Sequence, residues 1–183
     1  YWWIFFADSG NNRPTKQFMI LWSTRYTPWI KVMDKDWSCR ELPRREKDGT
    51  IRFNGMVAAW YYDGKEMLDP YLLRECDFEV ANLGGGKGHL RALDCNGEYT
   101  YEGEPEEYRV TIEHEGDRMM YELYPWHPML SDHFFEENVF KKKYRYNIYK
   151  IYGMKMKGAI NDERIKGTGY LQRVTVNAPA APW

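Results

Sequence analysis

The densest group of protonatable side chains lies within eleven residues and consists of His127, Asp132, His133, Glu136 and Glu137. Histidine and carboxylate groups at this density can bind a divalent metal or transfer protons. Their spacing matches no known ligand motif, however. The sequence therefore favours a solvated polar loop here and predicts no metal site.

A second group of chemically active residues belongs to one face of a predicted strand over residues 74–79. Side chains alternate along a strand, so three acids share that face: Glu75, Asp77 and Glu79. Burying three carboxylates would be costly. We expect the face to contact solvent or cations such as Lys155 and Lys157, with a calcium site as the less favoured alternative.

Two further motifs fall short of a catalytic or cofactor site. The stretch Leu83–Gly88 is rich in glycine, but it lacks the Lys-Ser/Thr ending of a phosphate-binding loop and no helical pattern follows it. It is better interpreted as a flexible β connection. No serine or cysteine has a recognisable nucleophile context, so catalytic residues stay unassigned and no cofactor is predicted.

The three cysteines are Cys39, Cys76 and Cys95. They are widely spaced and form no Cys-x-x-Cys pair, which argues against a zinc site and against a disulfide framework. A reducing compartment is then the default, and we expect a cytoplasmic protein.

The elements that must position these residues are short strands joined by tight turns. Three dipeptides are of the kind that tolerates positive φ in two-residue hairpins: Asp48-Gly49, Asp63-Gly64 and Asn96-Gly97. Two further turns are predicted at Glu115-Gly116 and Asn161-Asp162. Each turn is flanked by β-favouring residues and not by a helical period, which predicts successive hairpins.

Apolar runs and clean alternation mark the predicted strands. Tyr1–Ala7 and Lys16–Thr27 are predicted to form a long hairpin, and residues 108–113 alternate with Tyr108, Val110 and Ile112 on one face. Two charged or proline-containing stretches are predicted as long loops, the second with a short helical turn: Asp34–Lys47 and Tyr124–Val139.

Length and composition are consistent with one β domain. The 183 residues are enough for a core without metals or disulfides, and aromatic residues make up 17% of them. With 26 basic and 27 acidic residues, the formal charge of −1 gives no electrostatic reason to expect nucleic acid or an anionic membrane as a partner. No run of about 18 apolar residues that would span a bilayer is present.

Together these patterns predict an all-β fold, either an antiparallel barrel of the calycin or lipocalin kind or a two-sheet sandwich. We expect residues 1–183 to form a single domain. A barrel of this size can hold one small ligand. Because the sequence begins at Tyr1 and not at Met, we expect a processed product or a part of a longer chain.

Both ends of the chain resemble the carotenoid 1,2-hydratase (hydroxyneurosporene synthase) family of lipocalin-like proteins. The resemblance rests on the Trp2–Phe6 hairpin opening, on Tyr146–Ile160, and on the Gly-x-Gly-Tyr step at Gly167–Leu171. It implies a calycin-like architecture, often with two β domains in one chain, of which this chain would supply one. It also implies apolar ligands such as polyenes, isoprenoids or polyketide-like molecules.

The resemblance breaks down just after that step. Where the family commonly places an Asp-His pair, this sequence has Gln172 and Arg173. Glutamine does not exchange a proton near neutral pH and arginine stays charged, so the acid and base of a hydratase are missing there. An enzyme would need another acid, and the candidates are Asp132, Glu136 and Asp94.

The leading hypothesis is a domain that binds an apolar small molecule in an aromatic-lined β cavity. If the family's strand orientation holds, Tyr170 and Gln172 face the cavity and Arg173 faces outward. The residues predicted to contact the ligand are Trp3, Trp22, Trp60, Tyr62, Tyr170 and Gln172.

Two alternatives remain open. One is a hydratase, isomerase or cyclase that acts on such a molecule. The other is a structural or interaction module that packs against a second β domain or another copy of the chain, because Tyr1–Phe6 and Phe18–Trp22 are apolar on both faces.

Overall fold

A computed structural model of the chain describes residues 2–8, 15–23, 27–32, 34–39, 41–84, 87–93, 95–127, 130–139 and 142–177. All the regular structure in these ranges is β. The strands are β1 (Trp2–Asp8), β2 (Lys16–Ser23), β3 (Thr27–Val32), β4 (Lys35–Cys39), β5 (Arg44–Arg45), β6 (Ile51–Tyr62), β7 (Met67–Gly84), β8 (Lys87–Leu93), β9 (Glu98–Glu104), β10 (Glu107–His114), β11 (Asp117–Pro125), β12 (Leu130–Val139), β13 (Lys142–Ile160) and β14 (Glu163–Asn177).

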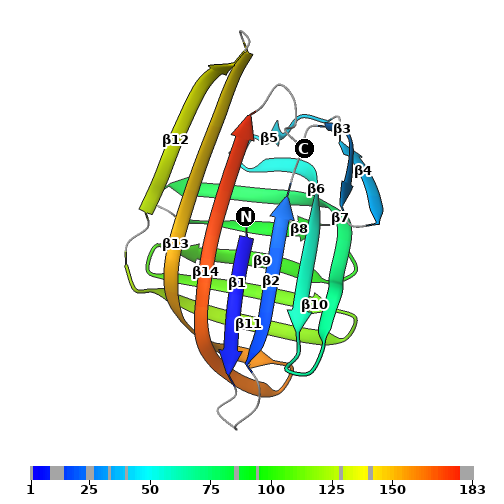
Figure 1. The fold of residues 1–183 in the computed structure, drawn as a ribbon, viewed down its shortest axis with the longest axis vertical. Coiled ribbons are helices and arrows are strands. Elements are labelled where there is room, and N and C mark those ends of the chain that lie inside the picture. The colour runs from blue at the N-terminus through cyan, green and yellow to red at the C-terminus, as the bar shows by residue number, and fades with distance from the viewer. Residues whose placement is uncertain are drawn as a thin grey trace.

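Ten of these strands close into an antiparallel barrel, which confirms the predicted fold class. The order around the barrel is β11-β10-β9-β8-β7-β6-β2-β1-β14-β13, and pairing between β11 and β13 completes the ring. In Figure 1 the strands β13, β14, β1, β2 and β6 run lengthwise, and β8 to β11 cross behind them at a steep angle. We call the end at which β1 begins and β2 ends the upper end.

The predicted hairpin turns have the backbone conformation that their residues favour. Gly64 and Gly97 have φ values of 101° and 141°, and Asn161 has a φ of 52°. In the β6–β7 turn, the Asp63 carboxylate also accepts the backbone N–H of Lys65 at 2.7 Å. Glycine and asparagine thus sit where the chain must turn back, which makes neighbouring strands antiparallel.

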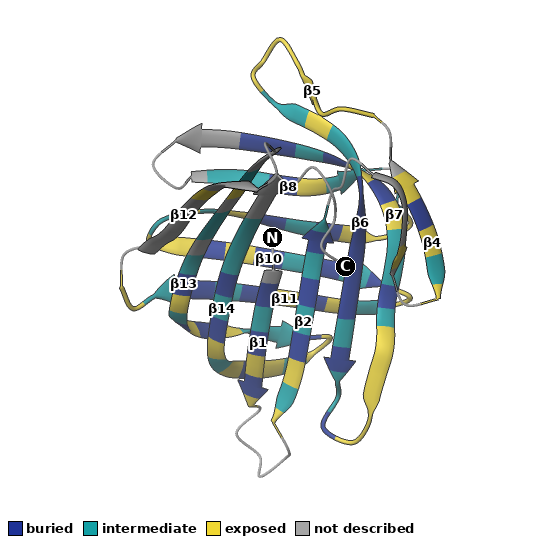
Figure 2. Cartoon of the chain, turned by 45° about the horizontal axis from the view of Figure 1, so that its top comes forward, coloured by how far each residue is buried: buried dark blue, intermediate teal, exposed yellow. Residues whose placement is uncertain are grey.

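Alternation along the strands builds the interior. On β10, Tyr108, Val110 and Ile112 are 4%, 0% and 0% exposed, which confirms the predicted inner face. Figure 2 shows the same alternation of buried and more exposed residues along the barrel strands. The inner side chains form one continuous apolar cluster that extends around the barrel.

The two predicted loops are partly strands, so that prediction was wrong. Asp34–Lys47 contains β4 and β5, and Tyr124–Val139 contains β12, where a short helical turn was expected. Residues 142–153 of β13 extend beyond its pairing with β11, and β12 supplies backbone partners for residues 142–150. The local sequence of β12 does not reveal that β13 is available to pair with it. Backbone pairing with β13 therefore makes β12 a strand despite its weak strand propensity. Lys16–Thr27 is likewise divided, because β2 ends at Ser23.

The bend after β11 is fixed by packing of Trp126 against Gly153 on β13. The backbone N–H of Trp126 donates to the Gly153 carbonyl at 3.1 Å, and a Cβ on Gly153 would lie 2.5 Å from the Trp126 ring. The register of β13 against β14 shifts between Ile151 and Met154, at this point. The bulge therefore lets the upper half of β13 leave the path set by β11.

The small hairpin β3–β4 covers part of the barrel's outer surface. Trp37 is 3% exposed and packs with Met56 and Leu73, whose side chains lie on the outside of β6 and β7. The Trp37 indole N–H also donates to the Asn54 side chain at 3.4 Å. One section of the outer apolar surface is thus buried by the chain itself.

Cys76 and Cys95 form a disulfide, which corrects the expectation that no disulfide is present. They are 19 residues apart in sequence, but the β7–β8 hairpin brings their Cα atoms to 6.1 Å. Spacing along the chain was a poor guide because a hairpin returns distant residues to the same place. With Cys76 and Cys95 joined, the cysteines no longer indicate a reducing compartment.

No helix within the described ranges has the length and apolar character needed to cross a membrane.

Candidate ligand-binding site

Four large aromatic residues meet inside the barrel toward its upper end. They are Trp3 on β1, Trp22 on β2, Tyr101 on β9 and Tyr108 on β10, and we call them the aromatic floor. The Trp3 ring lies 5.6 Å from the rings of both Tyr101 and Tyr108, and Trp22 lies 5.6 Å from Tyr101. All three contacts are tilted or edge-on, as expected for stable aromatic pairs.

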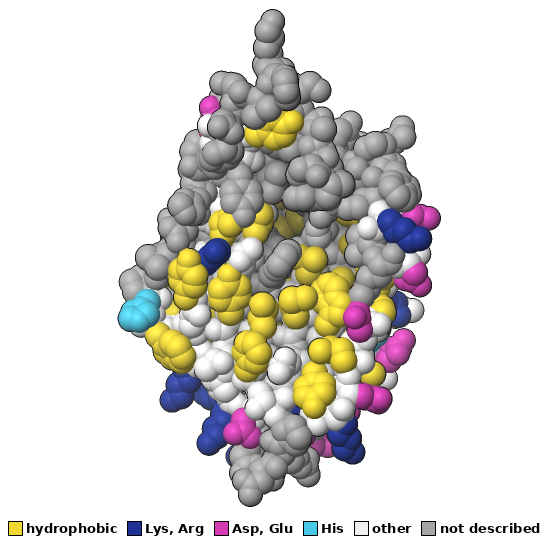
Figure 3. Space-filling model, viewed as in Figure 1, with side chains coloured by type: hydrophobic (Ala, Val, Ile, Leu, Met, Phe, Trp, Pro, Cys, Tyr) yellow, Lys and Arg dark blue, Asp and Glu magenta, His cyan; other side chains and the backbone are white. Residues whose placement is uncertain are grey.

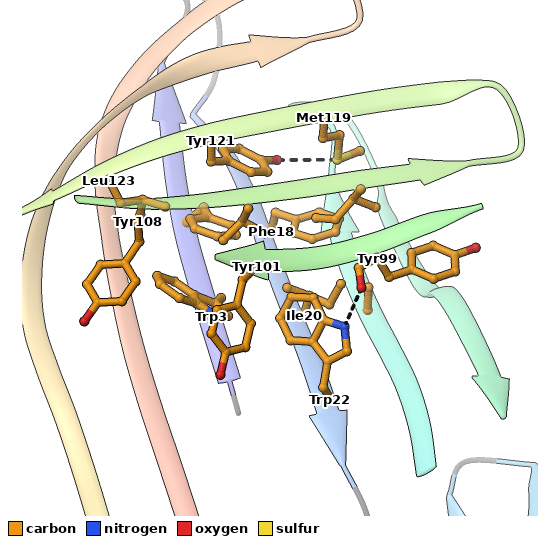
Figure 4. Close-up of a cluster of buried hydrophobic side chains, with 14 of the residues drawn as sticks. Trp3, Phe18, Ile20, Trp22, Tyr99, Tyr101, Tyr108, Met119, Tyr121 and Leu123 are labelled. Atoms are coloured by element: carbon orange, nitrogen blue, oxygen red, sulfur yellow. Dashed lines mark hydrogen bonds between the residues drawn. The ribbon is translucent and has the colours of Figure 1, made fainter. Parts of the chain in front are cut away.

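Strand register places these residues at one level. Trp3 pairs with Ile20 on β2, two residues before Trp22, and Tyr101 pairs with Val110 on β10, two residues after Tyr108. Figure 4 shows the hydroxyl groups of Tyr101 and Tyr108 directed away from Tyr121 and Met119, toward the upper end. The aromatic floor therefore presents the hydroxyl groups of Tyr101 and Tyr108 toward the upper end and its ring surfaces toward the core.

The two floor tryptophans differ in how their indole N–H groups are satisfied. Trp22 Nε1 donates to the Tyr99 carbonyl at 3.2 Å. Trp3 is 0% exposed, and among the described residues its buried Nε1 has no hydrogen-bond partner. A buried donor without an acceptor costs about 1–3 kcal/mol, so native proteins rarely retain one without a reason.

Beneath the floor the interior is filled by side chains. Phe5 stacks on Tyr121 with ring centroids 4.2 Å apart, and Phe18 lies 6.1 Å from Tyr121. The Tyr121 hydroxyl donates to the Met119 sulfur at 3.4 Å, and complete burial raises the pKa of Tyr121. This lower half is a packed core, so a ligand would have to approach the floor from the upper end.

The six residues predicted to contact a ligand divide between the two faces of the barrel wall. Trp3 and Trp22 point inward and belong to the core cluster. The others alternate with buried neighbours and lie on the outer face: Trp60, Tyr62, Tyr170 and Gln172. Two observations on Tyr170 agree with this placement. It pairs with Ile4, and its ring lies 6.4 Å from the ring of Tyr152, which is 55% exposed.

The expected orientation of β14 is therefore reversed. Leu171 is 4% exposed and belongs to the core cluster, so Arg173 shares its inner face while Gln172 points outward. Gly169 faces inward opposite Phe5, because a side chain there would meet Leu123 at 2.3 Å and Phe5 at 3.5 Å. Residues two and four positions after it lie on the same face.

Sequence reasoning missed Tyr101 and Tyr108 as site residues. Tyr108 was placed on a buried face and Tyr101 in a strand, but nothing in either strand indicated that the two would meet Trp3. That contact crosses the barrel from β1 to β9 and β10, strands that do not pair.

The acidic residues considered for metal binding or proton transfer are exposed or form ion pairs. Glu136 is exposed and pairs with Arg145 at 2.8 Å. On β7, Glu75 and Asp77 are exposed, and Glu79 pairs with Arg52 at 3.1 Å, where lysines of β13 were expected.

The remaining candidates are not brought together. His127 is exposed. Asp94, and the side chains of Asp132, His133 and Glu137, lie outside the described residues. In the part of the chain that the structure covers, no three His, Cys, Asp or Glu side chains are grouped so as to hold a metal.

A polar groove of about 600 Å³ lies between β7 and the β10–β11 turn, at the edge of the barrel core. Its buried histidine, His114, is 6% exposed, and its Nδ1 lies 3.0 Å from the Tyr99 hydroxyl. Tyr71 packs edge-on to His114 and donates to Asp117 at 3.0 Å, and burial together with this bond raises the pKa of Tyr71. These groups already have partners within the protein, so we assign these contacts a structural role.

Comparison with known proteins adds no relative: no family model, no curated protein and no solved structure matches this chain.

Proposed function

We propose that the protein binds an apolar small molecule at the upper end of the barrel, against the aromatic floor. One observation carries the proposal: the Trp3 indole N–H is buried among rings whose polar tips face that end, and no residue in the described ranges accepts its hydrogen bond. A ligand with a hydrogen-bond acceptor would satisfy this donor. Such a site, apolar with a few polar anchors, is the usual form of a small-molecule pocket.

The resemblance to carotenoid 1,2-hydratases supports a polyene or an isoprenoid as the ligand. Burying apolar surface contributes roughly 25 cal/mol per Å², and a long polyene offers enough surface for micromolar binding after the entropic costs. Catalysis is a weaker proposal, because the four floor residues supply phenols and indoles, and neither is an acid strong enough to protonate a double bond.

Quenching of tryptophan fluorescence by a panel of polyenes, isoprenoids and fatty acids tests the proposal. A bound polyene would lie against Trp3 and Trp22 and would quench their emission in a saturable way. Trp3→Phe should weaken binding severalfold, whereas Trp60→Phe, on the outer face, should leave the affinity unchanged. Absence of saturable quenching across the panel, with an interior already filled in an experimental structure, would refute it.

A second candidate function, self-association, rests on the outer face of β14, β1, β2 and β6. Tyr170, Ile4, Met19 and Trp60 follow one another in register across these strands, and the neighbouring Phe6 is 44% exposed. Figure 3 shows apolar side chains gathered over the middle of this face, with charged side chains at its margins. Trp37 covers the adjacent section, so the uncovered part resembles an interface.

Charge distribution favours a second copy of the chain as the partner. The exposed Lys155 and Lys166 lie on β13 and β14 at one side of the face, and the exposed Glu66 and Asp69 lie just before and on β7 at the other side. A two-fold axis parallel to the strands would oppose each margin to its opposite charge. Sedimentation would then show a dimer that Phe6→Glu disrupts and Leu42→Glu, in an exposed connection, does not. A monomer at all concentrations would exclude this candidate.

A further inference from the structure

The structural contacts within the polar groove leave one of its lining residues without a role: Arg74. Alternation places Arg74 on the inner face of β7, between Leu72 and Cys76, which are 2% and 1% exposed. Its direct partner on β6, Val57, also belongs to the core cluster. Arg74 therefore points inward at the edge of the core, where the groove leaves it partly exposed.

The Arg74 guanidinium has no counter-ion in the described part of the chain, where it enters no hydrogen bond and no ion pair. Its charge acts on the Tyr99 hydroxyl: burial raises the pKa of Tyr99, and the positive charge of Arg74 opposes that rise. A guanidinium carries five N–H donors and no acceptor, and a cation partly withdrawn from water is costly without a partner. A bound anion would supply this partner.

Two further groups of the groove can donate to the same anion. The Tyr99 hydroxyl lies closer to His114 Nδ1, at 3.0 Å, than to the Asn96 carbonyl, at 3.3 Å, so we assign it as the donor to Nδ1. The neutral imidazole then has its proton on Nε2, which lies 3.9 Å from the Glu115 carboxylate, beyond hydrogen-bond distance. Lys35 adds an ammonium from the start of β4, and Figure 2 shows β4 beside β7.

The remaining lining residues limit what the anion can be. The acids Asp34 and Glu115 are exposed at the groove and would repel a second negative charge on a ligand. The apolar lining includes Pro70 and Leu73, and a groove of about 600 Å³ has more room than an inorganic ion fills. The groove therefore suits one anionic group on a small apolar body.

We propose that this groove binds a small organic monocarboxylate, with its carboxylate at Arg74 and its apolar body against Pro70 and Leu73. The planar fork of a guanidinium matches the two oxygens of a carboxylate. None of the residues that line the groove belongs to the aromatic floor. The site is thus additional to the function proposed above and does not depend on it.

A matched pair of probes, benzoate and benzamide, tests the ligand class. The two share one ring and differ in whether the end group is charged. Affinities are measured by NMR titration of ¹⁵N-labelled protein at fixed ionic strength. We expect the wild type to bind benzoate at least about tenfold more tightly than benzamide, the effect of one charge-assisted hydrogen bond. Arg74→Gln should remove most of this preference and leave the affinity for benzamide within about twofold.

Two variants control for charge and folding. Arg91→Gln removes an exposed arginine of β8 and should bind both probes as the wild type does. Arg74→Lys keeps the cation and should lose part of the preference for benzoate, since a lysine contacts a carboxylate at a single point. If Arg74→Gln does not fold, Arg74→Lys decides, and an unchanged preference in that variant would contradict the proposal.

Three other outcomes would overturn the site. Equal binding of benzoate and benzamide by the wild type would show that charge is not recognised. A preference that survives Arg74→Gln, or that Arg91→Gln also removes, would show that benzoate is attracted elsewhere. Inorganic phosphate that binds more tightly than benzoate would exclude the carboxylate assignment. None of these results affects the quenching test of the aromatic floor, so the two proposals fail separately.

Discussion

The lower and upper halves of the barrel interior are built from the same residue types but differ in how their polar tips are used. In the lower half, Tyr121 donates to Met119. In the upper half, Trp3 has a buried N–H for which the described part of the chain supplies no acceptor. The contrast separates aromatic residues that hold the fold from an aromatic residue that the fold leaves incompletely satisfied.

The difference shows why aromatic content alone is a poor guide to a binding site. Trp3 and the stacked rings of Phe5 and Tyr121 are equally buried. Unsatisfied hydrogen-bonding capacity, and not burial, distinguishes them. The predictions below test this distinction by changing one half at a time.

The largest effect is expected from truncating the lower core. Phe5→Ala removes the ring that stacks on Tyr121 at 4.2 Å and leaves a cavity in a fully buried position. We expect a loss of about 3–5 kcal/mol in the free energy of unfolding, measured by urea denaturation. Phe6→Ala, at the adjacent but 44% exposed outer position, should cost less than about 1.5 kcal/mol. Equal losses at both positions would contradict the assignment of the two faces.

A smaller effect separates the two floor tryptophans. Trp3→Phe and Trp22→Phe both remove part of a buried ring, but only the second leaves the Tyr99 carbonyl without its 3.2 Å donor. We therefore expect Trp22→Phe to lower the free energy of unfolding by about 1 kcal/mol more than Trp3→Phe does. The reverse order in urea denaturation would show that the Trp3 N–H has a stabilising partner in the free protein.

Alkaline pH should weaken the lower half first. Burial, followed by the charges of Asp63, Asp117 and Glu163, raises the pKa of Tyr61 to about 12 from 10.0. Above pH 10 the unfolded chain loses this proton before the folded one does, so stability that is complete below pH 10 is lost progressively toward pH 12. Tyr61→Phe should flatten this decline in urea denaturation. An unchanged slope would mean that Tyr61 ionises freely in the folded state.

The smallest effect is expected on the outer face of β14. The Tyr170 hydroxyl donates to the Gln172 side chain at 2.5 Å, on a partly exposed surface. Tyr170→Phe should change the free energy of unfolding by less than about 1 kcal/mol. It should not affect ligand affinity measured by tryptophan quenching. A large loss of affinity would restore the orientation that the family resemblance suggested.

The sequence predicts the architecture better than it predicts the site. Turn residues such as Asp63-Gly64 and Asn96-Gly97 mark the hairpins because their backbone preferences act locally. The inner face of β10 follows from simple alternation. The pairing of β12 with β13, and the disulfide between Cys76 and Cys95, depend on which distant segments meet, and no local pattern records that.

The site was half predictable for a related reason. Trp3 and Trp22 were identified because their strands are strongly apolar. On β14, however, Tyr170 and Gln172 alternate with Leu171 and Arg173, and either face would suit a ligand cavity. The inward-facing Gly169, which makes room for Phe5 and Leu123, decides the orientation. It would have been the better guide than the family resemblance.

The most direct test is to follow the indole N–H resonances of tryptophan while a ligand is added. With ¹⁵N-labelled tryptophan and cis-parinaric acid, the Trp3 signal, assigned with Trp3→Phe, should move downfield as its N–H gains an acceptor. The Trp22 signal should move less because its N–H already donates to Tyr99, and the Trp60 signal on the outer face should not move. A largest shift at Trp60, or binding that leaves Trp3 unchanged, would contradict the account.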